Sequence, residues 1–155
     1  MRLLVGLDFS EATDTILRTA EDLAKGFAAD VWLLHVADPE PDFVGYDVGP
    51  QSVRDSLSER FHAEHRRIQE IADRLRRSGI AATALLVQGA TVETIVEKAS
   101  ELEVDIIVIG SHGRGAMHQL LMGSVSEGVI RHSRCPILVV PTHDYAQPSK
   151  MAEEP

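Results

Sequence analysis

Asp105-Ile106-Ile107-Val108-Ile109-Gly110 is the stretch that decides the fold, because four apolar residues in a row end there in a glycine. A short, continuously apolar run is typical of a strand that is buried on both faces, as in a parallel sheet. Runs of the same kind occur at residues 3–7, 31–36, 84–87 and 137–140. The sequence therefore predicts five strands that are covered by helices on both faces.

Segments with apolar residues at helical spacing separate the five runs. We expect four helices, which begin near Ala12, Val53, Thr91 and Val125. The segment from Asp8 to Ser10 is expected to cap the first helix, and Thr91 the third. Strands that alternate with helices, joined by right-handed crossovers, predict one doubly wound α/β domain with a parallel sheet in the order 3-2-1-4-5. We place this domain at residues 1–141 and expect a flexible polar tail at 142–155.

The predicted strand order reverses between the first and the fourth strand. Ligands of doubly wound sheets bind at such a reversal, outside the carboxyl ends of the strands. Asp8 follows the first strand and Gly110 ends the fourth, so we expect these two residues to lie side by side at a ligand site.

The glycines after the fourth strand have the chemistry of an anion-binding loop. Two residues separate Gly110 from Gly113, and nine separate Gly113 from Gly123, which Ser124 follows directly. Glycine lets the backbone approach phosphate oxygens, and a helix that starts after Gly123 would direct unpaired N–H groups at them. The hydroxyls of Ser124 and Ser126 add donors. The sequence has neither the P-loop motif nor the dinucleotide fingerprint.

The glycine spacing resembles the G-2x-G-9x-G-[S/T] pattern of ATP-binding universal stress proteins. Three further segments are similar to that family: residues 4–11, the strand end at 34–36 and the run at 135–141. The resemblance extends over residues 2–141. It implies ATP as the ligand, and the layered fold of the adenine nucleotide alpha hydrolases and the flavodoxins.

The resemblance also implies a role for each residue that matches the family pattern. Asp8, with the backbone of Gly6 and Leu7, would face ribose and adenine, while Val36 would offer its main chain to the adenine edge and Ile109 would pack on the base. Ribose and phosphates would be held by Gly110, Gly113, Gly123, Ser124 and Val125, with Ser126 beside them. Two roles stay open. Arg114 either neutralises phosphate charge or is solvated, and Asp8 either helps to hold Mg²⁺ or Mn²⁺ on the triphosphate or caps the first helix.

The composition argues against several classes of partner. The formal net charge of −9 opposes binding to nucleic acid or anionic lipid. The chain has no apolar run of roughly 18 residues, its N-terminus lacks the pattern of a secretory signal, and Cys135 is its one cysteine. We therefore expect a soluble, cytoplasmic protein. Because the histidines are scattered along the chain, we expect no structural metal site.

These observations favour a regulatory ATP-binding module over an enzyme, because the phosphate-binding loop comes without an evident general base. The alternative is a slow ATPase or a nucleotidyl-transfer enzyme on the same fold. A flavodoxin-like electron carrier is a third hypothesis, which the loop Asp8-Phe9-Ser10-Glu11 does not favour. We also predict regulatory protein partners of unknown identity, and a homodimer that forms through the edge strand Ile137 to Val140.

Overall fold

The computed structural model of the protein describes residues 1–38, 51–112 and 122–142, with side chains from residue 55 onward in the second range. Strands and helices alternate along these residues: β1 (Arg2–Gly6), α1 (Thr13–Phe27), β2 (Asp30–Ala37), α2 (Gln51–Arg77), β3 (Ala82–Gln88), α3 (Thr91–Glu101), β4 (Ile106–Gly110), α4 (Ser124–His132) and β5 (Ile137–Val140). Each apolar run identified in the sequence is a strand, and each segment with helical spacing is a helix.

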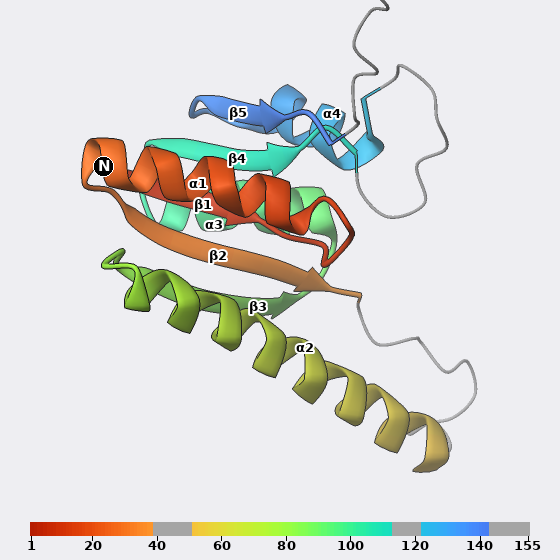
Figure 1. The fold of residues 1–155 in the computed structure, drawn as a ribbon. Coiled ribbons are helices and arrows are strands. Elements are labelled where there is room, and N and C mark those ends of the chain that lie inside the picture. The colour runs from red at the N-terminus through yellow and green to blue at the C-terminus, as the bar shows by residue number, and fades with distance from the viewer. Residues whose placement is uncertain (39–50, 113–121, 143–155) are drawn as a thin grey trace, which may run out of the picture.

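The strands form one parallel sheet in the order β3-β2-β1-β4-β5 (Figure 1). β1 lies in the centre, where Val5 is the register partner of Leu33 in β2 and of Val108 in β4. The predicted doubly wound fold, with the order 3-2-1-4-5 and four helices, is confirmed. Because the order reverses between β1 and β4, the carboxyl ends of these two strands open a crevice.

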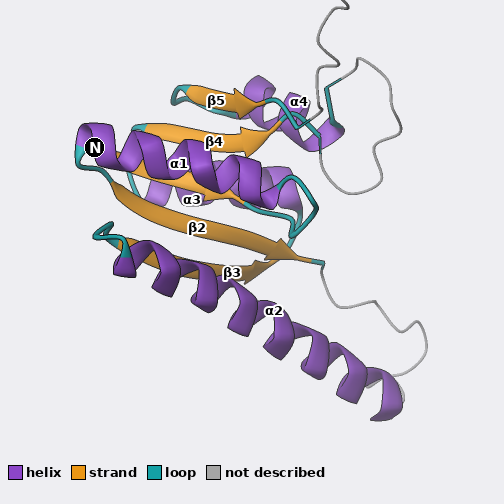
Figure 2. Ribbon diagram, viewed as in Figure 1, coloured by secondary structure: helices purple, strands orange, loops and turns teal. Residues whose placement is uncertain are grey.

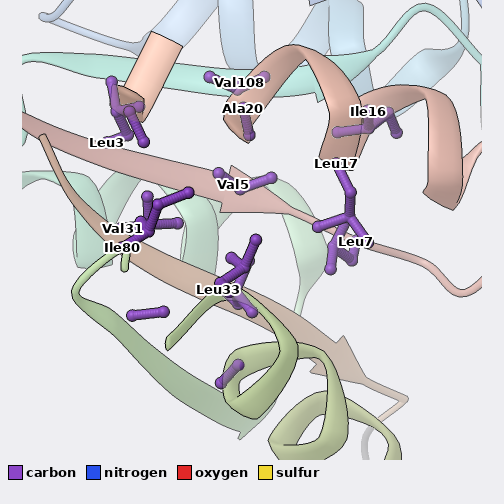
Figure 3. Close-up of a cluster of buried hydrophobic side chains, with 14 of the residues drawn as sticks. Leu3, Val5, Leu7, Ile16, Leu17, Ala20, Val31, Leu33, Ile80 and Val108 are labelled. Atoms are coloured by element: carbon purple, nitrogen blue, oxygen red, sulfur yellow. The ribbon is translucent and has the colours of Figure 1, made fainter. Parts of the chain in front are cut away.

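The helices cover the sheet in two layers, with α1 and α2 on one face and α3 and α4 on the other (Figure 2). Successive strand residues point to opposite faces, and both sets are buried. Val5 and Leu33 pack with Leu17 of α1 on the first face (Figure 3). Leu4 and Ile107 are buried in the cluster on the second face. Each buried side chain of this size contributes about 1.5–3 kcal/mol, so both layers hold the strand ends in fixed positions.

The capping residues of two helices differ from the sequence-based expectation, although both helices begin where expected. α1 begins after Ala12 and α3 after Ala90, whose side chains cannot cap a helix. The extended backbone of an N-cap falls at Ala90, so Thr91 is the first helical residue and not the cap. Asp8 lies further upstream, where its Oδ1 accepts a hydrogen bond from Ser10 N at 3.0 Å. The expectation that Asp8 caps α1 is therefore wrong, because its carboxylate closes a turn before the helix.

A glycine follows the end of α2. The helix ends at Arg77, and Gly79 follows with a φ of 82°, which favours glycine. Among the described residues, none of the helices is both long enough and apolar enough to cross a bilayer. Of the predicted polar tail, residues 143–155 lie outside the described residues.

Candidate functional site

A pocket of about 520 Å³ opens at the carboxyl ends of β1, β2 and β4. This volume is typical of small-molecule sites, which run from roughly 300 to 1,000 Å³. The predicted site residues that line it are Gly6, Leu7, Asp8, Val36, Ile109, Gly110, Gly123, Ser124, Val125 and Ser126. The structure thus brings together every predicted site residue that it describes. Gly113 and Arg114 lie outside the described residues.

A second hollow of similar size, about 530 Å³, lies between the start of α1 and the C-terminal half of α2, around Phe9 and Arg74. Its lining residues come from the turn after β1 and from these two helices, and none of them belongs to a strand. Because ligands of doubly wound sheets bind where the strand order reverses, the pocket at β1 and β4 is the better candidate.

The start of α4 forms one wall of this pocket. Gly123 is the N-cap, and the first bond of the helix runs from Glu127 N to Gly123 O at 3.0 Å. The main-chain N–H groups of Ser124, Val125 and Ser126 come before that bond and have no acceptor within the helix. With the positive end of the helix dipole, these N–H groups make a surface that attracts anions. We refer to these three N–H groups as the amide wall.

Hydrogen bonds from Gly123 and Ser126 hold the amide wall in place. Gly123 N donates to Ser111 O at 2.8 Å, and the buried hydroxyl of Ser126 donates to Gly110 O at 2.6 Å. The hydroxyl of Ser126 therefore donates its proton within the protein and not to a ligand. Of the two hydroxyls expected as ligand donors, the exposed one at Ser124 is the one that reaches the mouth of the pocket.

Ser111 ties the exit of β4 to the end of β5. Its N–H donates to Val140 O at 2.8 Å, and its hydroxyl oxygen accepts a hydrogen bond from Thr142 N at 3.1 Å. The hydroxyl oxygens of Ser111 and Thr142 also lie 3.1 Å apart. The segment that leads from β4 towards the amide wall is thus joined to the edge strand of the sheet.

The two described glycines of the loop motif differ in their surroundings and backbone. A Cβ atom at Gly110 would lie 2.9 Å from Thr142 Cγ2 and 3.0 Å from Ile16 Cδ1, so the protein itself fills that space. Gly123 has φ −65° and ψ 151°, which suit any residue. Backbone strain therefore does not require glycine at position 123.

The end of β2 offers main-chain groups to the pocket. β1 pairs with β2 as far as Gly6 and Leu34, and Leu7 N donates to Leu34 O at 2.9 Å. Alternate residues of a strand direct their main-chain groups to the same side, so the N–H and C=O of Val36 point to the same side as those of Leu34. This is the side on which β1 lies, but β1 ends before it reaches Val36. The main-chain groups of Val36 face the crevice, where the edge of a planar base can meet both a donor and an acceptor.

A second wall of the pocket carries charged side chains that the sequence analysis did not single out. His35 and Asp38 come from β2 and its end, and Arg60 and Glu64 come from α2. We refer to these four side chains as the charged wall. Arg60 Nη2 lies 2.8 Å from Asp38 Oδ2, and Arg60 Nε lies 3.1 Å from Glu64 Oε1. The hydrogen bonds to Asp38 and Glu64 raise the pKa of Arg60 above its usual value, so this side chain stays charged.

His35 joins the charged wall to β1. Its Nδ1 lies 2.7 Å from Leu7 O, and its Nε2 lies 3.6 Å from Glu64 Oε2. The ring of Phe9 packs on the imidazole with 4.2 Å between the ring centroids, and the Arg67 guanidinium lies 4.6 Å from the centroid of Phe9. Phe9 has a φ of 59°, which is unusual for a bulky residue. Arg67 Nη2 donates to Phe9 O at 3.3 Å and helps to hold this conformation.

A signal for the charged wall is present in the sequence. The apolar stripe of α2 includes residues 57, 61, 68, 71 and 75, and Glu64 occupies the stripe position between Phe61 and Ile68. An acidic residue on the buried side of a helix is rare unless it has a partner. The pattern therefore indicates a buried contact for Glu64, although it does not identify His35 as the residue contacted.

The residues present fit a metal ion only if the nucleotide supplies most of its ligands. Within residues 1–38, 55–112 and 122–142, no group of three or more His, Cys, Asp or Glu side chains is arranged to hold a metal ion. Asp8 lines the pocket and has one carboxylate oxygen bonded to Ser10 N. Mg²⁺ is usually bound through one or two carboxylates together with phosphate oxygens and water, which is compatible with this setting.

Comparison with known proteins identifies the family. Residues 1–141 match the model of the universal stress protein family. The chain belongs to that family. The universal stress protein MJ0577 of Methanocaldococcus jannaschii is 30% identical over 151 residues, which cover 90% of this chain and 93% of that protein. The solved structure of MJ0577 matches with a TM-score of 0.78 and covers 92% of this chain and 96% of that chain. The resemblance that the glycine spacing indicated is confirmed as membership of the universal stress protein family.

Two other solved universal stress proteins share the fold at lower identity. One, in complex with cAMP, is 24% identical with a TM-score of 0.64, covering 92% of this chain and 98% of that chain. The other, from Archaeoglobus fulgidus in complex with dAMP, is 20% identical with a TM-score of 0.59, covering 90% of this chain and 97% of that chain. At these identities the likeness shows that the fold is shared within the universal stress protein family.

Proposed function

We propose that this universal stress protein binds ATP in the pocket at the carboxyl ends of β1 and β4, and acts as a nucleotide-dependent regulatory module in the cytoplasm. The amide wall carries this proposal, because the N–H groups of Ser124, Val125 and Ser126 border the same pocket as Asp8 and Val36. Donors of this kind at a helix start stabilise phosphate charge.

The other surfaces of the pocket suit the uncharged parts of an adenine nucleotide. Ile95 and Ile109 supply apolar surface, and Val36 offers a main-chain donor and acceptor to a base edge. Complexes of two family members with cAMP and dAMP support this class of ligand. In ATP the additional phosphates would lie towards the amide wall, and Mg²⁺ or Mn²⁺ on those phosphates would be held with the help of Asp8.

We propose binding, and not turnover, as the activity. Phosphoryl transfer needs a positioned nucleophile and stabilised transition-state charge, and the described pocket residues offer donors without a P-loop lysine. Steady-state assays with Mg²⁺ or Mn²⁺ should give rates well below roughly 1 s⁻¹. The alternative, an ATPase or nucleotidyl-transfer enzyme, would be established by faster hydrolysis or transfer that one side-chain substitution abolishes.

Calorimetry with ATP tests the proposed site. Gly123→Val places a side chain in the space expected for phosphate, and Ser124→Asp places a negative charge beside it. Each variant loses charge-assisted bonds of about 1.5–3 kcal/mol, so affinity should fall at least about tenfold. Gly26→Ala in α1 is the control, because a Cβ atom there meets nothing within 4 Å. Equal ATP affinity in all folded proteins, checked by circular dichroism, would remove the assignment.

We further propose a homodimer that forms through β5. This strand lies at an edge of the sheet, and Ile137, Leu138 and Val139 are only partly buried. An apolar edge strand pairs with another chain unless it is covered. Val139→Lys should give a monomer by light scattering, whereas Thr83→Lys on the opposite edge strand should not change the mass. A monomeric wild-type protein at micromolar concentration would contradict the proposed dimer.

A further inference from the structure

The buried part of the charged wall contains an unsatisfied group. The relative exposure of His35 is 5%, and the Glu64 side chain is 13% exposed. Glu64 Oε1 accepts a hydrogen bond from Arg60, but Glu64 Oε2 is buried without a hydrogen-bond partner among the described residues. Because a buried polar atom without a partner is unfavourable, this oxygen requires an explanation.

The proton on neutral His35 is placed by its hydrogen bond to β1. Nδ1 lies 2.7 Å from Leu7 O, and a carbonyl oxygen only accepts, so Nδ1 must be the donor. Nε2 of a neutral ring is then an acceptor. It faces Glu64 Oε2, also an acceptor, at 3.6 Å. One added proton gives this pair a donor and removes the conflict.

The charges on α2 and at the end of β2 also favour an added proton. Arg60 is shared between Asp38 and Glu64, so these three side chains carry one net negative charge. A proton on His35 would make the charged wall neutral. Arg67, the other cation of α2 near the imidazole, contacts Phe9 and does not replace that proton.

Titratable groups of two other elements line the same pocket. Asp8 follows β1 and adds negative charge, and His112 follows β4. Among the residues that the structure describes, the set that can influence His35 is therefore Asp8, Asp38, Arg60, Glu64, Arg67 and His112. Acidic side chains outnumber arginines in this set, and a bound nucleotide adds further negative charge.

We propose that His35 and Glu64 form a proton-binding site in the wall of the pocket, and that this site is filled when an anionic nucleotide is bound. The inference rests on the proposed function. Negative charge in the pocket stabilises the imidazolium, so proton binding and nucleotide binding favour each other. The proton is present at low pH and is lost as pH rises, so affinity for an anionic nucleotide must fall with rising pH.

cAMP and adenosine are the probes that separate this effect from titration of the ligand. The phosphodiester of cAMP keeps one negative charge between about pH 5.5 and 8.5, and adenosine is neutral over that range. In calorimetry on the wild-type protein, affinity for cAMP should fall roughly threefold to tenfold from the low to the high pH. Affinity for adenosine should change much less. Titrations in two buffers of different ionisation enthalpy should show proton uptake with cAMP.

Two substitutions remove the proton-binding site while keeping the local hydrogen bonds. Glu64→Gln keeps an acceptor for Arg60, and the amide of His35→Asn can replace the Nδ1 donor to Leu7 O. Both variants should bind cAMP with a pH-independent affinity. His35→Asn leaves the charged wall with its net negative charge, so its affinity should be close to that of the wild type at high pH. Glu64→Gln makes the wall neutral without an added proton, so its affinity should be close to that of the wild type at low pH.

Matched controls test whether any histidine or glutamate gives the same result. His132 is exposed and has its Nδ1 2.8 Å from Gly128 O, and Glu103 is exposed and lies 3.1 Å from Arg2. His132→Asn and Glu103→Gln should keep the pH dependence of the wild type.

The outcomes distinguish this inference from the proposed function. Binding of cAMP that is equally tight at all pH values overturns the proton-binding site and leaves nucleotide binding intact. Absence of binding of ATP, cAMP and adenosine overturns both. If His35→Asn does not fold, imidazole nitrogen NMR of the wild type decides. A proton gained at His35 Nε2 on addition of cAMP supports the inference, and an unchanged ring contradicts it.

Discussion

The amide wall is made of main-chain N–H groups from one turn of α4, whereas the charged wall is made of side chains from two elements that lie far apart in the sequence. Among substitutions only proline removes a main-chain donor, and any other residue can only move it. The charges of Asp38, Arg60 and Glu64 can be removed one at a time. The amide wall should therefore respond to changes in packing, and the charged wall to changes in charge and pH.

Packing behind the amide wall should give the largest effect on stability. A Cβ atom at Gly128 would lie 2.7 Å from Val92 Cγ2, where α4 packs on α3. Gly128→Ala should destabilise the protein by about 1–3 kcal/mol in urea unfolding, because valine is stiff and the helices must separate. Val92→Ala in the same chain should recover most of the loss. An equal loss in the single and double variants would show that this contact is not the cause.

The hydrogen bond inside the amide wall should give the next largest effect. Ser126→Ala removes the donor to Gly110 O and leaves that carbonyl unsatisfied, at a cost of about 1–2 kcal/mol. The start of α4 is then less well fixed, so ATP affinity should also fall a few-fold in calorimetry. Ser133→Ala is the matched control, because its hydroxyl bonds to Cys135 O outside the pocket. It should lower stability without changing ATP affinity, and an equal change in affinity would contradict the role given to Ser126.

The rim of the charged wall should give the smallest effect on stability. Asp38→Asn should cost less than about 1 kcal/mol in thermal unfolding, because exposed ion pairs contribute little. Glu103→Gln is the control: the side chains of Glu103 and Arg2 are 82% and 46% exposed, against 82% and 48% for Asp38 and Arg60. The two variants should lose the same small amount of stability. A loss of more than about 1 kcal/mol at Asp38 alone would show that its pair with Arg60 is not an ordinary surface ion pair.

The sequence predicts the sheet and the amide wall better than the charged wall, for a physical reason. Apolar runs such as 106–109 have few alternatives to burial, and the spacing of Gly110 and Gly123 fixes where α4 begins. The contact between His35 and Glu64 depends on how α2 crosses the end of β2, which periodicity does not specify. The start of α1 was predicted correctly, but its cap was not, because Asp8 has a nearer donor, Ser10 N, in the turn.

Ser111 has a consequence for assembly, because it is bonded both to the chain around β5 and to the start of α4. Its hydrogen bonds with Val140, Thr142 and Gly123 mean that the lip of the pocket and the edge of the sheet cannot move independently. Coupled binding equilibria are reciprocal. If a ligand in the pocket changes the affinity of the sheet edge for a partner, that partner changes the affinity for the ligand by the same factor. If the protein dimerises through β5, occupation of the pocket would change the dissociation constant of the dimer. No separate signalling element would be needed.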